Sequence, residues 1–280
     1  MTVFSLWQPT PAAGNSLVQG VRSVIRWARR NAQNLTWRRE LFLVALLYGM
    51  YELSRGFASS GGVATAMSNG RDILKWETWA HLDPEHALNA SLTHSTLFAV
   101  IAAYDYSMFH YIVTPAVLIW MFRKHTPQYR FARTTLAWST VVGFVGFYLV
   151  PTAPPRLLAG SGLHDTLADV SNWGWWSDEG SVPRGLGGLS NQFAAMPSLH
   201  VGWAVWAGVL MFKFGSSRLL KVLGVVYPTT TMVVVMATGN HYLLDVVAGA
   251  AAIALAAWFT RLQFRRAARF GDLELELATN

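Results

Sequence analysis

AMPSLHVG at residues 195–202 and TGNHYLLDVVAG at residues 238–249 each place a histidine at the start of a long apolar run. Ionisable side chains at the ends of apolar segments are costly to keep in a membrane and usually mark a functional site. If the two runs are neighbouring membrane spans, His200 and His241 can face one another at the same depth. The two stretches therefore predict a helical membrane protein with acid–base or nucleophilic chemistry.

The remainder of the chain also has the composition of a polytopic membrane protein. Its 280 residues are 52% hydrophobic and only 13% charged, whereas soluble domains carry about 25% charged residues. The apolar residues form six segments close to spanning length. We therefore expect an all-α fold, a bundle of six transmembrane helices with amphipathic helices in the outer loops. The expected spans are residues 41–57, 107–122, 134–150, 196–212, 222–238 and 242–262.

Lysine and arginine residues set the expected orientation of the bundle. They cluster before the first span, after the second, after the fourth and after the sixth, and the positive-inside rule places all four clusters in the cytoplasm. We expect a basic cytoplasmic segment (1–40), a catalytic membrane domain (41–262) and a cytoplasmic tail (263–280). This topology gathers five polar residues at the extracytoplasmic ends of their spans: Arg156, Ser198, His200, His241 and Asp245.

Composition also excludes several classes of function. The basic residues behind the net charge of +7 lie between apolar runs, so nucleic acid is not an expected partner. The absence of cysteine excludes disulfides and thiolate metal sites. No carboxylate-rich or paired-histidine pattern predicts a metal, and we expect no cofactor. The expected partners are the bilayer, a phospholipid substrate and a lipid or water acceptor, and the oligomeric state is left open.

The first residues of the sequence and its composition predict a cellular location. Residues 1–37 show no apolar region followed by a small-residue cleavage site, so we expect no cleaved signal peptide. The alanine-rich, basic composition is typical of a bacterial plasma membrane protein.

His241 and Asp245 are four residues apart, a spacing that puts both on one face of a helix. The carboxylate can then accept a hydrogen bond from one imidazole nitrogen, fix the tautomer and leave the other nitrogen free to attack. Alone, this pattern more often indicates a buried structural hydrogen bond. The PSLH stretch at residues 197–200 changes that balance.

In PSLH, the proline can begin a helix without losing an intrahelical hydrogen bond. The backbone N–H groups of the first turn, including that of Leu199, then form an anion site together with the Ser198 hydroxyl. His200 follows directly and is suited to protonate a leaving oxygen. The alternative is an ordinary helix start with a histidine at the membrane interface.

PTAPPR at residues 151–156 ends the third expected span and holds Arg156 at the interface. A guanidinium is a good bidentate partner for phosphate, and the alternative is an arginine that only reaches toward the aqueous interface. In the loop that follows, Trp173, Trp175 and Trp176 are expected in the headgroup zone of the outer leaflet, as a lid or a plain anchor.

Three residues open the second expected span on the same outer side: Asp105, Tyr106 and His110. We expect them to line a headgroup pocket and to contact sugar or inositol hydroxyls. An aromatic belt with a hydrogen-bonded histidine is an equally compatible interpretation.

Together, PTAPPR, PSLH and NHYLLD at residues 240–245 resemble the type 2 phosphatidic acid phosphatase superfamily. They are similar in particular to its inositol phosphorylceramide synthase-like branch, over roughly residues 104–250. The resemblance implies that His241 is a nucleophile forming a phosphohistidine, oriented by Asp245. It implies that His200 is the general acid and then the base. No metal is implied.

The resemblance also implies a phosphate-binding set made of Arg156, the Ser198 hydroxyl and the backbone of Leu199. Two further cations of the superfamily pattern are missing, because Leu149 and Val235 stand at their positions. A phosphoryl transition state needs compensation for its negative charge. We therefore expect Arg184, in the outer loop, to replace one of them.

The predicted function is a membrane phosphotransferase or phosphatase acting at the outer leaflet, on a phospholipid with an inositol phosphate-type headgroup. A polyprenyl or phosphatidate-type lipid phosphate phosphatase is the alternative. A proton-coupled transporter is more distant, because the sequence shows no internal repeat.

Overall fold

The computed structural model describes residues 36–43, 45–46, 49, 62–176 and 191–279. The chain divides into two compact units, Met1–Gly49 and Met50–Asn280. In the first unit, residues 37–43 are helical. Every element considered below belongs to the second unit. Most of the expected first span (41–57) and Arg184 lie outside the described residues.

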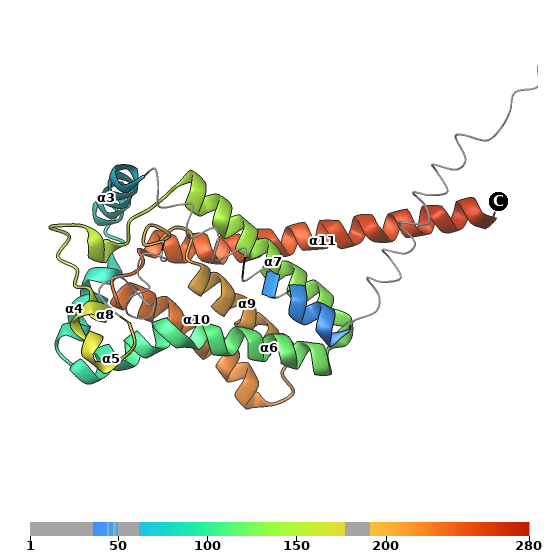
Figure 1. Cartoon of the computed structure of the whole chain (residues 1–280), viewed down its shortest axis with the longest axis horizontal. Coiled ribbons are helices and arrows are strands. Elements are labelled where there is room, and N and C mark those ends of the chain that lie inside the picture. The colour runs from blue at the N-terminus through green and yellow to red at the C-terminus, as the bar shows by residue number, and fades with distance from the viewer. Residues whose placement is uncertain (1–35, 44, 47–48, 50–61, 177–190, 280) are drawn as a thin grey trace, which may run out of the picture. The chain divides into compact units, whose positions relative to one another are not determined.

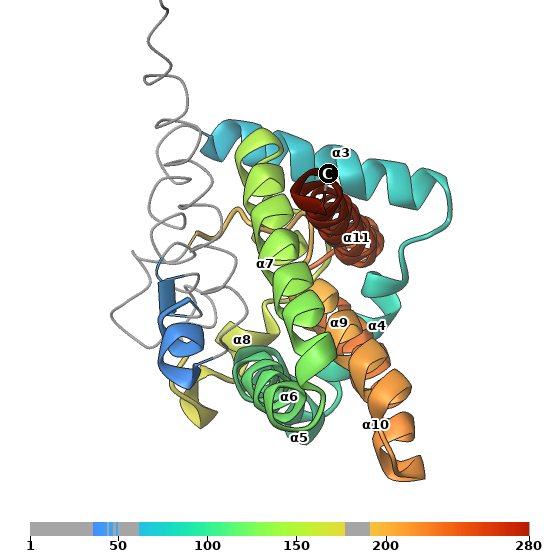
Figure 2. The same ribbon diagram turned by 90° about the vertical axis from the view of Figure 1, so that its right-hand side faces the viewer.

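The second unit is built from helices, and none of its described residues forms a strand. Five of them run broadly side by side, while α3 (Val63–Trp79) runs across their direction near the end where α11 begins (Figures 1 and 2). An all-helical fold is thus confirmed for the described part of the chain. The five are α6 (His110–Lys124), α7 (Thr126–Leu149), α9 (Leu199–Phe214), α10 (Arg218–Ala237) and α11 (Leu243–Thr279).

α9 occupies the middle of this bundle and packs against α6, α7, α10 and α11. Small residues make the close approaches possible. A Cβ added at Gly249 of α11 would overlap the Ser198 carbonyl oxygen, and one at Gly202 of α9 would lie 3.1 Å from the Gly249 oxygen. The first turns of α9 and α11 are therefore in backbone contact. The two histidine motifs begin these two helices.

Within the described residues, three helices are long and apolar enough to cross a membrane: Thr96–Lys124, Arg218–Ala237 and Leu243–Arg269. They coincide with the expected second, fifth and sixth spans, while α9 is a shorter apolar helix and α7 covers the expected third span. The full set of six spans and its orientation remain predictions.

The second expected span begins earlier than the sequence suggested. α5 (Thr96–Tyr104) continues through the π-helical turn η1 (Asp105–Phe109) into α6, so the helix starts at Thr96 rather than at residue 107. A π-helical turn accommodates an extra residue and is frequent at functional sites. Here it contains Asp105 and Tyr106.

Short helices in the loop between α7 and α9 pack against elements that precede α6. This loop contains η2 (Pro155–Leu157), α8 (Thr166–Asp169) and η3 (Ser171–Trp173), and α8 packs against α4 (Pro84–Thr93) and α5. Trp176 is fully buried, and its indole N–H donates to the Leu167 carbonyl at 3.0 Å. The expected headgroup-zone position is therefore wrong for Trp176, whereas Trp173 and Trp175 are exposed.

Candidate active site

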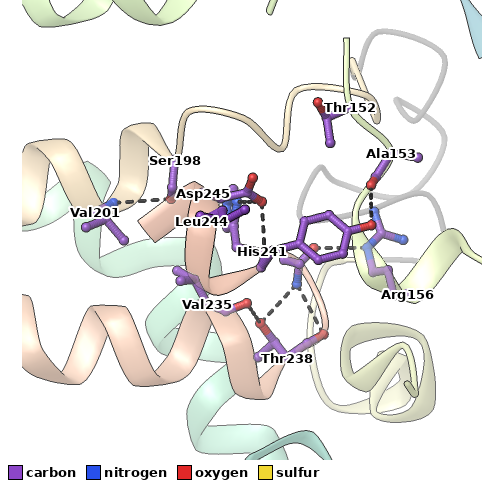
Figure 3. Close-up of polar contacts among 12 residues, drawn as sticks. Thr152, Ala153, Arg156, Ser198, Val201, Val235, Thr238, His241, Leu244 and Asp245 are labelled. Atoms are coloured by element: carbon purple, nitrogen blue, oxygen red, sulfur yellow. Dashed lines mark hydrogen bonds and ion pairs between the residues drawn. The ribbon is translucent and has the colours of Figure 1, made fainter. Parts of the chain in front are cut away.

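His241 and Asp245 form a buried pair at the turn that joins α10 to α11 (Figure 3). His241 Nδ1 lies 3.2 Å from Asp245 Oδ2, and that oxygen also accepts the Tyr242 N–H at 3.0 Å. An N–H at Nδ1 donating to the carboxylate puts the lone pair of the imidazole on Nε2. His241 lies two residues before α11 rather than on a face of it, so Asp245 reaches back from the first turn of the helix to contact the ring.

The turn before the pair has a backbone that few residues tolerate. Gly239 has a φ of 72°, in the left-handed region that glycine adopts without strain. The Val235 carbonyl accepts the N–H groups of Asn240 and His241, and the Asn240 side-chain amide donates to Thr238 Oγ1 at 3.0 Å. These bonds fix where His241 leaves the turn.

Ser198 begins α9, and its side chain caps the helix. Its Oγ accepts the Val201 N–H at 3.4 Å, and its own N–H donates to the Asp245 backbone carbonyl at 3.1 Å (Figure 3). The second bond ties the start of α9 to the first turn of α11. The Leu199 N–H lies in a first turn whose N–H groups have no intrahelical acceptor. Its contact with a phosphate stays a prediction.

His200 follows one residue later, and its ring centroid lies 6.0 Å from that of His241. The tie between the two helix starts produces this closeness, because each histidine is within four residues of it. The structure therefore brings the two imidazoles together. A phosphorus atom bound between them can be reached by one ring while the other transfers a proton.

Side chains from η1 and α6 complete the surroundings of the two histidines. Tyr106 stacks on His200, with ring centroids 4.5 Å apart and planes 23° apart, and its ring lies 6.5 Å from that of His241. His110 contacts His200 edge-on at 4.4 Å. Asp105 and His110 are both buried. The three residues expected to line a headgroup pocket thus include two in ring contact with His200.

Arg156 is held beside the His241 turn. Its Nη1 donates to Asp165 Oδ2 at 2.7 Å, its Nε donates to Asn240 Oδ1 at 2.9 Å, and its backbone N–H donates to the Gly239 carbonyl at 2.9 Å. The side chain is only 4% exposed. This burial contradicts the alternative in which Arg156 merely reaches toward the aqueous interface.

Asn89 of α4 joins the Arg156 loop to the end of α10. Its amide donates to the carbonyls of Ala237 and His164, and its Oδ1 accepts the His164 N–H at 2.7 Å. Sequence reasoning missed Asn89 and also Asp165. A short polar residue in a half-apolar helix was the only available signal for Asn89, and Asp165 had none beyond its position nine residues after Arg156.

Apolar residues stand at the two positions where the superfamily pattern has further cations. Leu149 is exposed at the end of α7, and Val235 is buried, with its carbonyl engaged in the His241 turn. Within residues 62–176 and 191–279, no group of three or more histidine and carboxylate residues is arranged to hold a metal ion.

Comparison with known proteins identifies a family. Residues 71–259 fit the model of a family described as PAP2 superfamily, a range that contains all three motifs and the geometry above. No curated protein and no solved structure matches the chain.

Proposed function

This chain belongs to the PAP2 superfamily of phosphatases and phosphotransferases, and we propose that it cleaves a phosphoester of a membrane lipid through a phosphohistidine. His241 is the nucleophile, Asp245 orients it, and His200 is the general acid and base. The observation that carries the proposal is the closeness of the two imidazoles, 6.0 Å between ring centroids, with Asp245 on Nδ1 of one of them.

In the first step, His241 Nε2 attacks the phosphorus of the lipid headgroup. A phosphorus–nitrogen bond forms, and the bond from phosphorus to the leaving oxygen breaks. The leaving alkoxide takes a proton from His200, because an alcohol leaves poorly as an anion. Asp245 stabilises the positive charge that develops on the His241 ring. In the second step, His200 removes a proton from the acceptor, whose oxygen attacks phosphorus and releases His241.

The phosphate oxygens need donors during both steps. Arg156 uses Nε and Nη1 in bonds to Asn240 and Asp165, and its Nη2 is the group proposed to reach a phosphate oxygen. The Leu199 N–H and the Ser198 hydroxyl are proposed on the other side, at the positive end of the α9 dipole. Arg184 is proposed as a further cation, from outside the described residues.

Arg156→Ala is expected to lower kcat/KM for a lipid phosphoester by about 100-fold to 1,000-fold, the usual effect of removing one charge-stabilising donor. Arg156→Lys keeps the charge but not the fork of donors, so its loss is expected to be intermediate. Steady-state kinetics in detergent or nanodiscs measure both.

Asp165→Asn provides the matched control for this prediction. It keeps an acceptor near Arg156 and leaves the guanidinium in place, so a loss of less than about tenfold is expected. Activity of Arg156→Ala within threefold of wild type would remove Arg156 from the phosphate site.

The acceptor decides between transfer and hydrolysis. His241 is 3% exposed, and a site shielded from bulk water favours transfer to a lipid alcohol. We propose transfer of an inositol phosphate-type headgroup, as in the inositol phosphorylceramide synthase-like branch, with a phosphatidate or polyprenyl phosphate phosphatase as the alternative. The reaction is proposed at the outer leaflet of a plasma membrane, without a metal.

Product analysis on a lipid panel tests the proposal. The purified protein is incubated with phosphatidylinositol plus ceramide, with phosphatidate, and with a polyprenyl phosphate. A new phosphodiester lipid identifies transfer, whereas inositol phosphate released from phosphatidylinositol, or free phosphate released from the two monoesters, identifies hydrolysis. A protein that consumes none of these lipids, while intact by circular dichroism, would contradict the proposed substrates.

Asp105→Asn and His110→Gln are expected to change the preference among headgroups by about tenfold, since each would remove a buried polar contact to the headgroup. The measurement is the ratio of kcat/KM for phosphatidylinositol to that for phosphatidate. His94→Gln, at an exposed position, serves as control. Unchanged ratios in both variants would remove Asp105 and His110 from the headgroup pocket.

A further inference from the structure

Two buried carboxyl groups lie behind the candidate active site. Glu77 of α3 is 3% exposed and Glu85 of α4 is fully buried. Among the described residues, no lysine or arginine forms an ion pair with either, and no hydroxyl or amide side chain donates to Glu85. Two uncompensated buried charges would cost far more than the fold can supply. These groups therefore need another source of stability.

That source is their contact with each other. Glu77 Oε2 and both carboxyl oxygens of Glu85 are buried with no hydrogen-bond donor in place among the described residues, and the two carboxyl groups interact with each other. A hydrogen bond between two carboxyl groups requires a proton on one of them, because two carboxylates offer only acceptors. In such a bond the pair holds one proton and at most one negative charge.

Glu77 also caps the helix that carries Asp245. Its Oε1 accepts the Leu244 N–H at 2.6 Å, across 167 residues of sequence. Leu244 lies in the first turn of α11, where backbone N–H groups have no intrahelical acceptor. The next residue, Asp245, reaches back to His241 Nδ1 and to the Tyr242 N–H. Glu77 thus holds the helical turn that orients Asp245 and, through Asp245, His241.

We propose that Glu77 and Glu85 are a proton-sharing positioning pair for the active site. Glu77 anchors the first turn of α11 from α3, and Glu85 keeps the pair at one negative charge. The proposal rests on the proposed function of His241 and Asp245. Neither glutamate touches the reacting atoms, so both act through the orientation of Asp245.

The charge of the pair gives the proposal a pH signature. Burial raises the pKa of Glu77 to about 9, and the interaction with Glu85 adds to the shift. Burial also raises the pKa of Glu85. The other titratable groups around the pair are Asp245 of α11, which disfavours a second charge, Tyr242 before α11, and Asp83 and His86 beside Glu85.

The direction in which stability changes with pH follows from the pKa of Glu77. In the unfolded chain the group loses its proton near pH 4.5, and in the folded chain near pH 9. The folded state therefore binds more protons between these values, so stability falls as pH rises from about 4.5 to about 9 and levels off above. Loss of the shared proton also places a second charge near Asp245, so kcat is expected to fall with an apparent pKa close to 9.

Glu77→Gln and Glu77→Ala separate capping from charge. Gln keeps an oxygen for the Leu244 N–H and can donate to Glu85, so kcat at pH 7 is expected within threefold of wild type, without the fall near pH 9. Ala loses the cap, and kcat is expected to drop about tenfold or more with little change in KM. A tenfold drop corresponds to a rise of about 1.4 kcal/mol in the activation free energy when Asp245 is misplaced. Asp72→Asn, an exposed carboxylate of the same helix, is the control.

A second readout does not depend on turnover. The melting temperature of wild type and of Asp72→Asn is expected to fall between pH 6 and pH 9. For Glu77→Gln the fall over the same pH range is expected to be about 4 °C smaller. Equal slopes in Glu77→Gln and Asp72→Asn would overturn the shared proton. Wild-type kcat in Glu77→Ala would overturn the positioning role. Full turnover in a His241 variant would instead contradict the proposed function, and the melting data would still decide the shared proton.

Discussion

His241→Gln is expected to lower kcat for lipid phosphoester turnover by about 10⁴-fold or more, as removal of a covalent nucleophile does in enzymes whose catalytic residues act as a unit. Glutamine keeps a polar side chain of similar length but has no lone pair on a basic nitrogen. Its amide can still donate to Asp245, which limits damage to the buried turn. The loss should therefore appear in kcat with little change in folding.

The measurement is the rate of product formation from whichever lipid of the panel the wild type consumes. His94→Gln replaces an exposed histidine and is expected to retain full activity. Circular dichroism and melting temperature check that the His241 variant is folded. A folded His241→Gln protein with more than a tenth of wild-type kcat would exclude a histidine nucleophile at this position.

His200→Gln is expected to lower kcat for a lipid substrate by about 10²-fold to 10⁴-fold, the range for a general acid–base. The effect depends on the leaving group. An alkoxide needs the proton of His200, whereas a nitrophenolate leaves without one. With p-nitrophenyl phosphate, the first step should therefore survive while the second, which needs a base, is slowed.

Burst kinetics distinguish the two steps for this variant. A burst of nitrophenolate close to one equivalent per enzyme, followed by slow turnover, is the expected result. His164→Gln, whose side chain is 60% exposed, is expected to behave as wild type. A burst rate with p-nitrophenyl phosphate that falls as much as the turnover of the lipid would contradict a leaving-group acid at His200 and would indicate a role in binding.

The closeness of His200 and His241 could be anticipated from sequence for a physical reason. Each histidine begins an apolar helix, and the positive-inside rule places both helix starts on one side of a membrane. What the sequence did not contain is the direct link between them, the bond from the Ser198 N–H to the Asp245 carbonyl. Gly249, which permits this approach, carries no chemical signal of its own.

The residues that support the site were harder to predict because their partners are distant in the sequence. Glu77 lies in an amphipathic stretch where a carboxylate is ordinarily on the solvated face, yet it is buried against α11. Trp176 likewise fits a headgroup-zone pattern and is instead a core residue. Its ring packs against that of Tyr104, with the ring centroids 4.9 Å apart. Local periodicity reports which residues are apolar, and it cannot report which loop folds back over them.

The same limit applied to Arg156. Its motif predicted a cation near phosphate, but not the two bonds that fix the guanidinium to Asn240 and Asp165. Only one of these partners belongs to a recognisable motif. The start of the second helix at Thr96 was missed for another reason, because Asp105 and Tyr106 break the apolar pattern within a continuous helix.

Covalent labelling of His241 tests the central claim most directly. The protein is mixed with phosphatidylinositol, phosphatidate and a polyprenyl phosphate, each labelled with ³²P, quenched in alkali and mapped by mass spectrometry. The expected result is acid-labile label on His241 from the lipid that is turned over, and none on His241→Gln. Label on another residue, or turnover of a panel lipid with no covalent label, would contradict the account.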